Sequence, residues 1–438
     1  MGMAIARARR RRLGVWMSAA AVVAVLLGLA VPWGLSRGKA VPTAPSSLPD
    51  RVGAPHWGTA SVDSSPAGAA SVVFGAPSWW LTGSKGVLAV VGASDDSYRL
   101  TDELGDLLYA GEQAILSPDG SRLATVGLVT DLNKGTSVAL PVPDGVPQAW
   151  SPDGRTLAVV AYDAPYARQP DGSEVPTPVQ ATLHLADLAS HTYERVADLD
   201  PRGVHDGYTV AFAPDGTKLA YQSAQTITVA TVAGETVSQF TTSGHLAGKG
   251  AWTPDGMGLT LVSQRRCCDG DSYPARWQLS VVDPANGQAR SAPAIPELPG
   301  LVAVRLLGWS PAGEAVVAAL YPEPDISVVG FDTAAETLSV AHLRFTDYQW
   351  VRETKVLAVG PGGASRTLLS APEQEMLSVD VADNVIAGGQ ARTGQPPRGL
   401  GTRLLGTVVV IVALAVALAV VVRRAGNRLR RAPRGPVI

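Results

Sequence analysis

The sequence predicts an all-β protein, a seven-bladed β-propeller flanked by two single transmembrane helices. Two observations lead to this fold class. One short apolar frame recurs seven times along the chain, and an uncharged apolar run of 19 residues lies near each end. Repeats at such intervals are typical of architectures in which each unit buries its apolar face against its neighbours.

In each repeat, a bulky apolar anchor residue is followed seven positions later by a leucine or valine that opens a short strand. Four copies contain Pro-Asp-Gly, namely LSPDGSRLATV from Leu116, WSPDGRTLAVV from Trp150, FAPDGTKLAYQ from Phe212 and WTPDGMGLTLV from Trp252. A fifth copy lacks the Asp (WSPAGEAVVAA from Trp309), and two keep only the frame (LTGSKGVLAVV from Leu81 and WVRETKVLAVG from Trp350). Proline, aspartate and glycine together favour a tight reversal of the chain. Each copy therefore predicts a hairpin between the first and second strands of a blade.

The anchors are separated by 35, 34, 62, 40, 57 and 41 residues. A four-stranded blade needs roughly 40–50 residues, so the longer intervals hold insertions. No helical periodicity interrupts residues 70–390, which excludes alternating βαβ units. Seven anchors predict seven blades, with six as the open alternative, and Val72–Gly75 is predicted to supply a closing strand to the last blade.

The anchor pattern, Trp or Phe, then Ser, Ala or Thr, then Pro-Asp-Gly and a leucine, resembles the TolB-type, WD40-like propeller repeat of bacterial envelope proteins. The resemblance covers about residues 75–390. It implies the propeller architecture without implying one function, because that family includes scaffold proteins, peptidase propeller domains and lactonase-like enzymes.

Two apolar runs, Leu13–Val31 and Leu404–Val422, are long enough to cross a bilayer. Basic residues flank the outer end of each, which predicts cytoplasmic termini and an extracytoplasmic domain between them. The predicted localisation is therefore the cell membrane, with two passes and the lipid bilayer as one partner. A cleaved signal peptide is the alternative for the first run, although this run is longer than a usual signal h-region.

Charge divides the chain in the same way. All 38 acidic residues but only 25 of the 36 Lys and Arg lie within 37–403, giving that segment a formal charge of −13, which disfavours nucleic acid as a partner. The predicted segments are a basic cytoplasmic tail (1–12), a transmembrane helix or uncleaved signal anchor (13–35), a flexible Pro-, Ser- and Gly-rich linker (36–70), the extracytoplasmic propeller (71–390), a linker (391–403), a second transmembrane helix (404–422) and a second basic tail (423–438).

Long loops on a rigid scaffold often carry binding sites, although surface insertions are also tolerated without a function. Three long insertions within blades are predicted at Tyr162–Gln180, Ser263–Arg276 and Gly360–Gln374, and two long connections between blades at Asp198–Tyr208 and Arg290–Leu301. The resemblance places all of them on the face opposite the anchor turns. The candidate partner-binding residues are Tyr162, Tyr166, Arg168, Arg265, Arg266, Cys267, Cys268, Asp269, Asp271, Tyr273, His205 and Asp206.

Cys267 and Cys268 are the only cysteines, and in an oxidising compartment they predict a strained vicinal disulfide. Two free thiols and an intermolecular bridge are the alternatives. The following Asp269-Gly270-Asp271 has alternating carboxylates of the kind that bind calcium, but it lacks the EF-hand pattern and is better explained as a turn.

The sequence contains no coherent catalytic constellation. Its six histidines show no zinc-ligand spacing, and His205-Asp206 is the only His–carboxylate neighbour pair on the predicted loop face. We therefore predict no catalytic residue, cofactor or metal.

The predicted function is that of a membrane-tethered binding or assembly module, whose partner is another envelope protein or a cell-wall component. Two alternatives stay open. One is a lactonase-like or glycan-acting hydrolase with its site in the central channel. The other is an envelope sensor in which a disulfide or a small ligand changes the conformation of a loop.

Overall fold

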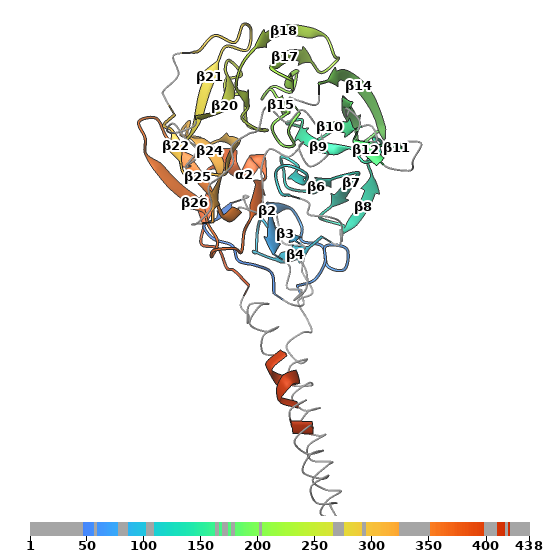
Figure 1. Cartoon of the computed structure of the whole chain (residues 1–438), viewed down its shortest axis with the longest axis vertical. Coiled ribbons are helices and arrows are strands. Elements are labelled where there is room, and N and C mark those ends of the chain that lie inside the picture. Colours follow the sequence, from blue (N-terminus) through green and yellow to red (C-terminus); the bar gives the residue numbers. More distant parts are fainter. Residues whose placement is uncertain are drawn as a thin grey trace, which may run out of the picture. The chain divides into compact units, whose positions relative to one another are not determined.

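The computed structural model describes residues 47–56, 59–77, 86–101, 109–162, 166–168, 174–176, 180–200, 204–265, 276–290, 295–323, 351–397, 410–416 and 419–420. Six antiparallel sheets of four strands each form the blades of a β-propeller (Figure 1). The predicted all-β propeller is therefore confirmed. We name the strands of each blade A to D in their order across the sheet, starting from the innermost strand; the A strands of blades 1 to 4 contact one another in turn.

Five blades are built from consecutive stretches of the chain. Blade 2 contains β5 (Ile115–Leu116), β6 (Arg122–Thr125), β7 (Leu128–Asp131) and β8 (Thr136–Ala139). Blade 3 contains β9 (Val146–Trp150), β10 (Thr156–Tyr162), β13 (Ala181–Asp187) and β14 (Thr192–Leu199). Blade 4 contains β15 (Val210–Phe212), β16 (Lys218–Ser223), β17 (Thr226–Thr231) and β18 (Thr236–Thr241).

Blade 5 contains β19 (His245–Leu246), β20 (Leu259–Arg265), β21 (Arg276–Val282) and β22 (Leu298–Pro299). Blade 6 contains β23 (Ala303–Trp309), β24 (Ala315–Pro322), β25 (Val351–Val359) and β26 (Ser365–Leu369). Blade 1 joins the C-terminal β27 (Ser378–Val381) to β2 (Ala70–Pro77), β3 (Gly86–Gly92) and β4 (Tyr98–Leu100).

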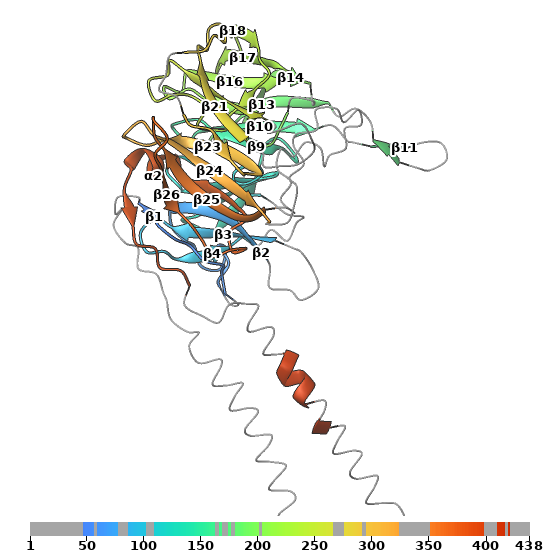
Figure 2. The same ribbon diagram turned by 60° about the vertical axis from the view of Figure 1, so that its left-hand side comes forward.

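Five further elements of the described chain lie outside the blades. The hairpin β11 (Tyr166–Arg168) and β12 (Glu174–Pro176) forms its own two-stranded sheet, and Figure 2 shows β11 apart from the sheet of blade 3. The short strands β1 (Leu48–Pro49) and β28 (Ala391–Arg392) pair in parallel. Helix α2 (Asp383–Gly388) follows β27 directly.

The anchor turns form for the reason that their chemistry predicts. In the first, Gly120 takes φ +71°, and Oδ1 of Asp119 accepts a hydrogen bond from the backbone N–H of Ser121 at 2.9 Å. The Asp residues of the other Pro-Asp-Gly turns accept the same bond from the residue two positions on. Five anchors stand at A–B hairpins as predicted, namely Leu116, Trp150, Phe212, Trp252 and Trp309.

The prediction of seven blades is wrong, because the two copies that keep only the frame are not A–B hairpins. The frame at Trp350 runs into β25, which is the C strand of blade 6. The frame at Leu81 begins between β2 and β3, the B and C strands of blade 1. Both copies lack the Pro-x-Gly turn, and apolar alternation alone identifies a strand without giving its place in a blade.

The ring is closed by pairing of its two ends. Val72, Val73, Phe74 and Gly75 of β2 pair with Val381, Asp380, Val379 and Ser378 of β27. The predicted pairing of Val72–Gly75 with a C-terminal strand is thus present, and the shared sheet is blade 1. Since this blade takes its A strand from the C-terminal part of the chain, five anchor turns and one shared blade account for the six blades.

The part of the chain that the structure describes does not contain the two predicted transmembrane helices. Among the residues that the structure describes, no helix is both long enough and apolar enough to cross a membrane. Residues 13–35 lie outside the described part of the chain, and within 404–422 the described helical residues are 410–416 and 419–420.

Candidate binding face and its axial polar cluster

The B–C connections within blades and the D–A connections between blades emerge on the same face of the propeller. Two predicted insertions are B–C connections, since Tyr162–Gln180 joins β10 to β13 and Ser263–Arg276 joins β20 to β21. A third and longer B–C connection, which the sequence reasoning missed, joins β24 to β25 across residues 323–350. We call the face that holds the strand ends flanking these three connections the loop face.

Two other predicted connections were assigned to the wrong face. Within Gly360–Gln374, residues 360–364 close the C–D hairpin from β25 to β26, where Gly360 N–H donates to the Ala364 carbonyl at 2.9 Å. Arg290 lies in the C–D connection from β21 to β22, so it also belongs to the opposite face. The first error follows from counting Trp350 as the anchor of a further blade. That count makes the strand after Trp350 a B strand, so the connection that follows it was taken for a B–C connection.

The predicted partner-binding residues fall into three groups. Tyr162, His205 and Asp206 lie near the propeller axis, as described below. Tyr166 and Arg168 belong to β11, and Arg265 ends β20, opposite Arg276. The third group lies outside the described part of the chain and consists of Arg266, Cys267, Cys268, Asp269, Asp271 and Tyr273. The predicted disulfide between Cys267 and Cys268 therefore lies outside it as well.

Asp206 is the centre of a polar cluster on the axial side of the loop face. Its side chain is buried, and it accepts hydrogen bonds from Tyr162 Oη at 2.9 Å, Gln113 Nε2 at 3.1 Å and Gln148 Nε2 at 3.5 Å. The Oε1 atom of Gln148 accepts a further bond from the Gly207 N–H at 3.2 Å. These residues come from blade 3 and from the connections before blades 2 and 4, so the cluster ties three neighbouring parts of the ring together.

The protonation of Tyr162 follows from this setting. Burial first, and then the charge of Asp206 and the hydrogen bond to it, raise the pKa of Tyr162 well above its ordinary value. The phenol therefore keeps its proton and acts as a hydrogen-bond donor. The Tyr162–Asp206 pair positions the loop face and is not suited to act as a nucleophile or a general base at neutral pH.

His205 packs against a second histidine that the sequence reasoning did not select. The rings of His205 and His245 lie edge to face with their centroids 4.9 Å apart, and Gln222 Nε2 lies 3.4 Å from Nδ1 of His245. Burial lowers the pKa of His205 to about 3, with a smaller contribution from His245, and burial lowers the pKa of His245 to about 4. Both rings are therefore neutral at physiological pH.

Two buried cations hold the A strands together near the axis. Arg305 of β23 lies 3.2 Å from Glu112 and donates to the carbonyls of Ala110 at 3.0 Å and Val379 at 2.9 Å. Its sequence signal was a single charge inside the apolar run LVAVRLLGW. These contacts join blade 6 to blade 1 and to the connection before blade 2.

Lys249 forms the second buried ionic contact. Its Nζ lies 3.0 Å from Asp380 and 2.7 Å from Asp383, and it donates to the Val381 carbonyl at 2.7 Å. Burial alone would lower the pKa of Lys249, but the two carboxylates outweigh it and the pKa is raised. The ammonium group therefore stays charged and links blade 5 to β27 and α2.

Replacing Tyr162 with phenylalanine tests the Asp206 cluster. The variant loses the Oη donor to a carboxylate that is only 2% exposed, and we expect the free energy of unfolding to fall by about 1–2 kcal/mol. Urea denaturation measures this change. Tyr193→Phe is the matched control, because Tyr193 is 50% exposed and its variant should stay within about 0.5 kcal/mol of the wild type. Equal stabilities of the two variants would show that Asp206 does not depend on this phenol.

The described part of the chain holds no group of three His, Cys, Asp or Glu side chains that could bind a metal ion. No known family model matches the sequence, and no curated protein matches it significantly.

Several solved structures resemble this chain in fold. TolB from Acinetobacter baumannii is 14% identical over 68% of each chain, with a TM-score of 0.30. Hydrazine synthase from Kuenenia stuttgartiensis is 18% identical over 61% of this chain and 68% of the other, with a TM-score of 0.35. Oligogalacturonate lyase in complex with manganese is 12% identical over 74% of this chain and 90% of the other, with a TM-score of 0.37. These likenesses concern the fold alone, and TolB structures are among them.

Proposed function

We propose that this protein is a binding module and that its partner, another protein of the cell envelope, docks on the loop face. The observation that supports this most strongly is the length of the B–C connections in blades 3, 5 and 6, which all start and end at strand ends on that face. The A–B hairpins on the opposite face are closed by tight turns instead. Long loops gathered on one side of a rigid scaffold are a common form of binding surface.

The rigidity of the scaffold supports the same proposal. The Asp206 cluster fixes the end of β10, from which the blade 3 insertion leaves, and the ion pairs of Arg305 and Lys249 join non-consecutive blades. A scaffold that is already ordered loses less conformational entropy when a partner binds. The location in the cell envelope rests on the sequence alone.

Site-specific photo-crosslinking tests the docking face. A photoreactive amino acid is placed at Tyr166 in the blade 3 insertion or, as the control, at Ala189 in the exposed C–D turn of the same blade. We expect covalent adducts with one protein from the Tyr166 position in native cells, and none from the Ala189 position. A second experiment places the photoreactive amino acid at Arg265, on the blade 5 insertion, and replaces residues 163–179 of the blade 3 insertion with a short Gly-Ser linker. If one partner contacts both loops, this replacement should abolish capture at Arg265.

Two results would contradict the proposal. Adducts formed equally from Tyr166 and Ala189 would show that capture does not depend on the loop face. Adducts with cell-wall glycan and with no protein would show that the partner is of another chemical class.

A further inference from the structure

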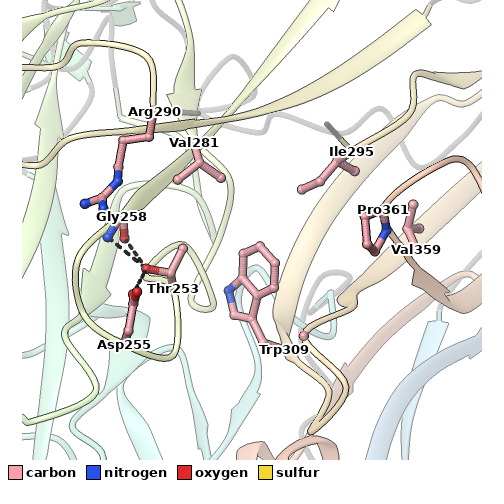
Figure 3. A pocket seen from close by; sticks show the side chains of 10 residues that line it. Thr253, Asp255, Gly258, Val281, Arg290, Ile295, Trp309, Val359 and Pro361 are labelled. Atoms are coloured by element: carbon pink, nitrogen blue, oxygen red, sulfur yellow. Dashed lines mark hydrogen bonds between the residues drawn. The ribbon is translucent and has the colours of Figure 1, made fainter. Parts of the chain in front are cut away.

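A groove lies between blades 5 and 6 on the face that carries the A–B and C–D turns, opposite the loop face (Figure 3). Its volume is about 290 Å³, close to the lower end of the range typical of ligand sites. We call it the Trp309 groove, and its lining residues are Thr253, Asp255, Gly258, Val281, Arg290, Ile295, Trp309, Gly313, Val359 and Pro361.

Trp309 differs from the other aromatic anchors in its exposure. Trp150, Phe212 and Trp252 are 4–6% exposed, whereas Trp309 is only partly buried. Its orientation is nevertheless the usual one. Trp309 Nε1 donates to the Gly250 carbonyl of the preceding blade at 3.0 Å, as Trp150 does to Ile115 at 3.3 Å. The exposure of Trp309 therefore depends on what covers the ring.

The blades also differ at the residue six positions after the anchor of the preceding blade. Three copies of the motif have a side chain there, Arg122, Thr156 or Lys218, and Arg122 reaches across to the Gly154 carbonyl of blade 3 at 3.5 Å. Blade 5 has Gly258 instead. A Cβ at Gly258 would lie 2.6 Å from Cγ1 of Val281, in the wall of the groove. Gly258 does not have a positive φ, so the close packing of Val281 and Thr253, which a Cβ would meet at 2.6 and 2.9 Å, is what favours glycine here. Blade 5 therefore has no side chain at this position that could cover Trp309.

The two walls of the groove differ in chemistry, with Trp309 between them (Figure 3). On one side, Thr253 Oγ1 donates to Asp255 at 2.6 Å, and Arg290 donates to the Met257 carbonyl above them. The exposed Asp255 and Arg290 supply hydrogen-bond acceptors and donors at this rim. The opposite wall is aliphatic and consists of Ile295, Val359 and Pro361.

We propose that the Trp309 groove binds a short peptide segment of a partner protein through one apolar side chain. Such a side chain covers the indole ring and the aliphatic wall, while the amide groups of the same segment face Asp255 and Arg290. A tryptophan in a pocket is a common energetic centre of protein interfaces. A sugar fits less well, because hydroxyl groups around its whole perimeter would lose hydrogen bonds with water against the aliphatic wall. This site is separate from the loop face and does not depend on the function proposed for it.

The test uses defined small probes and the full chain labelled with 5-fluorotryptophan. Fluorine NMR follows the Trp309 signal, which the variant Trp309→Phe identifies, during titration with N-acetyl-leucine methylamide. We expect a saturable shift with a Kd on the order of 1 mM, since a ligand of this size reaches only weak affinity. N-acetyl-glycine methylamide, which lacks the side chain, and methyl glucoside should leave the signal in place.

Two variants and a matched control connect the shift to the groove. Gly258→Thr introduces the residue that blade 3 has at this position, and because its Cβ would displace Val281 and Thr253 in the lining, it should weaken binding about tenfold or more. Arg290→Gln changes an exposed rim residue without touching the core and should weaken binding roughly threefold. Arg155→Gln, an exposed residue on the anchor turn of blade 3, should have no effect.

Three outcomes would overturn the proposal. One is a Trp309 signal that does not respond to the leucine probe. Another is a response to methyl glucoside in its place. The third is unchanged binding of the leucine probe by both Gly258→Thr and Arg290→Gln.

Discussion

Replacing Arg305 with methionine is expected to lower the free energy of unfolding by about 3–5 kcal/mol, the largest effect that we predict for a single side chain in this protein. The guanidinium is 1% exposed and lies 3.2 Å from Glu112, whose side chain is 0% exposed. Methionine has an unbranched apolar side chain that can replace the aliphatic part of the arginine, but it removes the cation from beside a buried carboxylate. The cost therefore comes mainly from the charge that remains in a low-dielectric environment.

The position of Arg305 in the ring explains why its loss should affect the whole fold. One guanidinium contacts the connection before blade 2 through Ala110 and Glu112, and strand β27 of blade 1 through Val379. Strand β27 is the element that closes the ring. The backbone is also shaped around this group, because Gly111 has φ +83° and a Cβ there would lie 2.1 Å from Nη2 of Arg305.

Denaturation in urea, followed by tryptophan fluorescence, measures the effect. Arg366→Met is the matched control, since Arg366 is 58% exposed and its ion pair with Glu314 should contribute less than about 1 kcal/mol. In the double variant Arg305→Met with Glu112→Gln, part of the loss should be recovered, because no buried charge is then left without its cation. If Arg305→Met were no more destabilising than Arg366→Met, closure of the ring would not depend on this ion pair.

The sequence predicted most of the blades because their first turn has a local chemical cause. Wherever Pro-Asp-Gly or Pro-Ala-Gly follows the anchor, an A–B hairpin is present, from Leu116 to Trp309. The error in the blade count arose at Leu81 and Trp350, where the frame has no such turn. An apolar strand such as Val351–Val359 is compatible with any place in a buried sheet, so its position in a blade depends on its partners.

The candidate site was only partly predictable, because its members meet through the closure of the ring. Tyr162 and Asp206 were both selected from the sequence, but they are 44 positions apart, and Gln113 is 93 positions from Asp206. No local pattern indicates such pairs. Gly258 is a different case, because comparing the aligned copies of the motif shows that one copy lacks a side chain. Only the structure connects this glycine to the exposure of Trp309.

The stability of the propeller is expected to fall as the pH drops from 6.5 towards 4, because of His205 and His245. Both residues have folded-state pKa values, about 3 and about 4, below the ordinary value of 6.5 that they regain on unfolding. Between these limits the unfolded chain binds protons that the folded chain does not, so acid favours unfolding. Lowering a folded-state pKa by one corresponds to about 1.36 kcal/mol of stability. Solvent reaches both rings in part, which reduces their contribution. We therefore expect the two histidines to lower the free energy of unfolding by about 3 kcal/mol between pH 7 and 4.5.

The decisive measurement is the slope of unfolding free energy against pH in variants that cannot titrate. With both histidines replaced by glutamine, the slope between pH 6.5 and 4.5 should become markedly shallower, whatever the stability of this variant at pH 7. His191→Asn is the control, because His191 is exposed and its φ of +56° is one that asparagine also tolerates, so the wild-type slope should be retained. An unchanged slope in the double variant would mean that the two rings take up protons in the folded protein. The contact between the connection before blade 4 and strand β19 would then tolerate charge, because the two imidazolium rings would face each other without unfolding the chain.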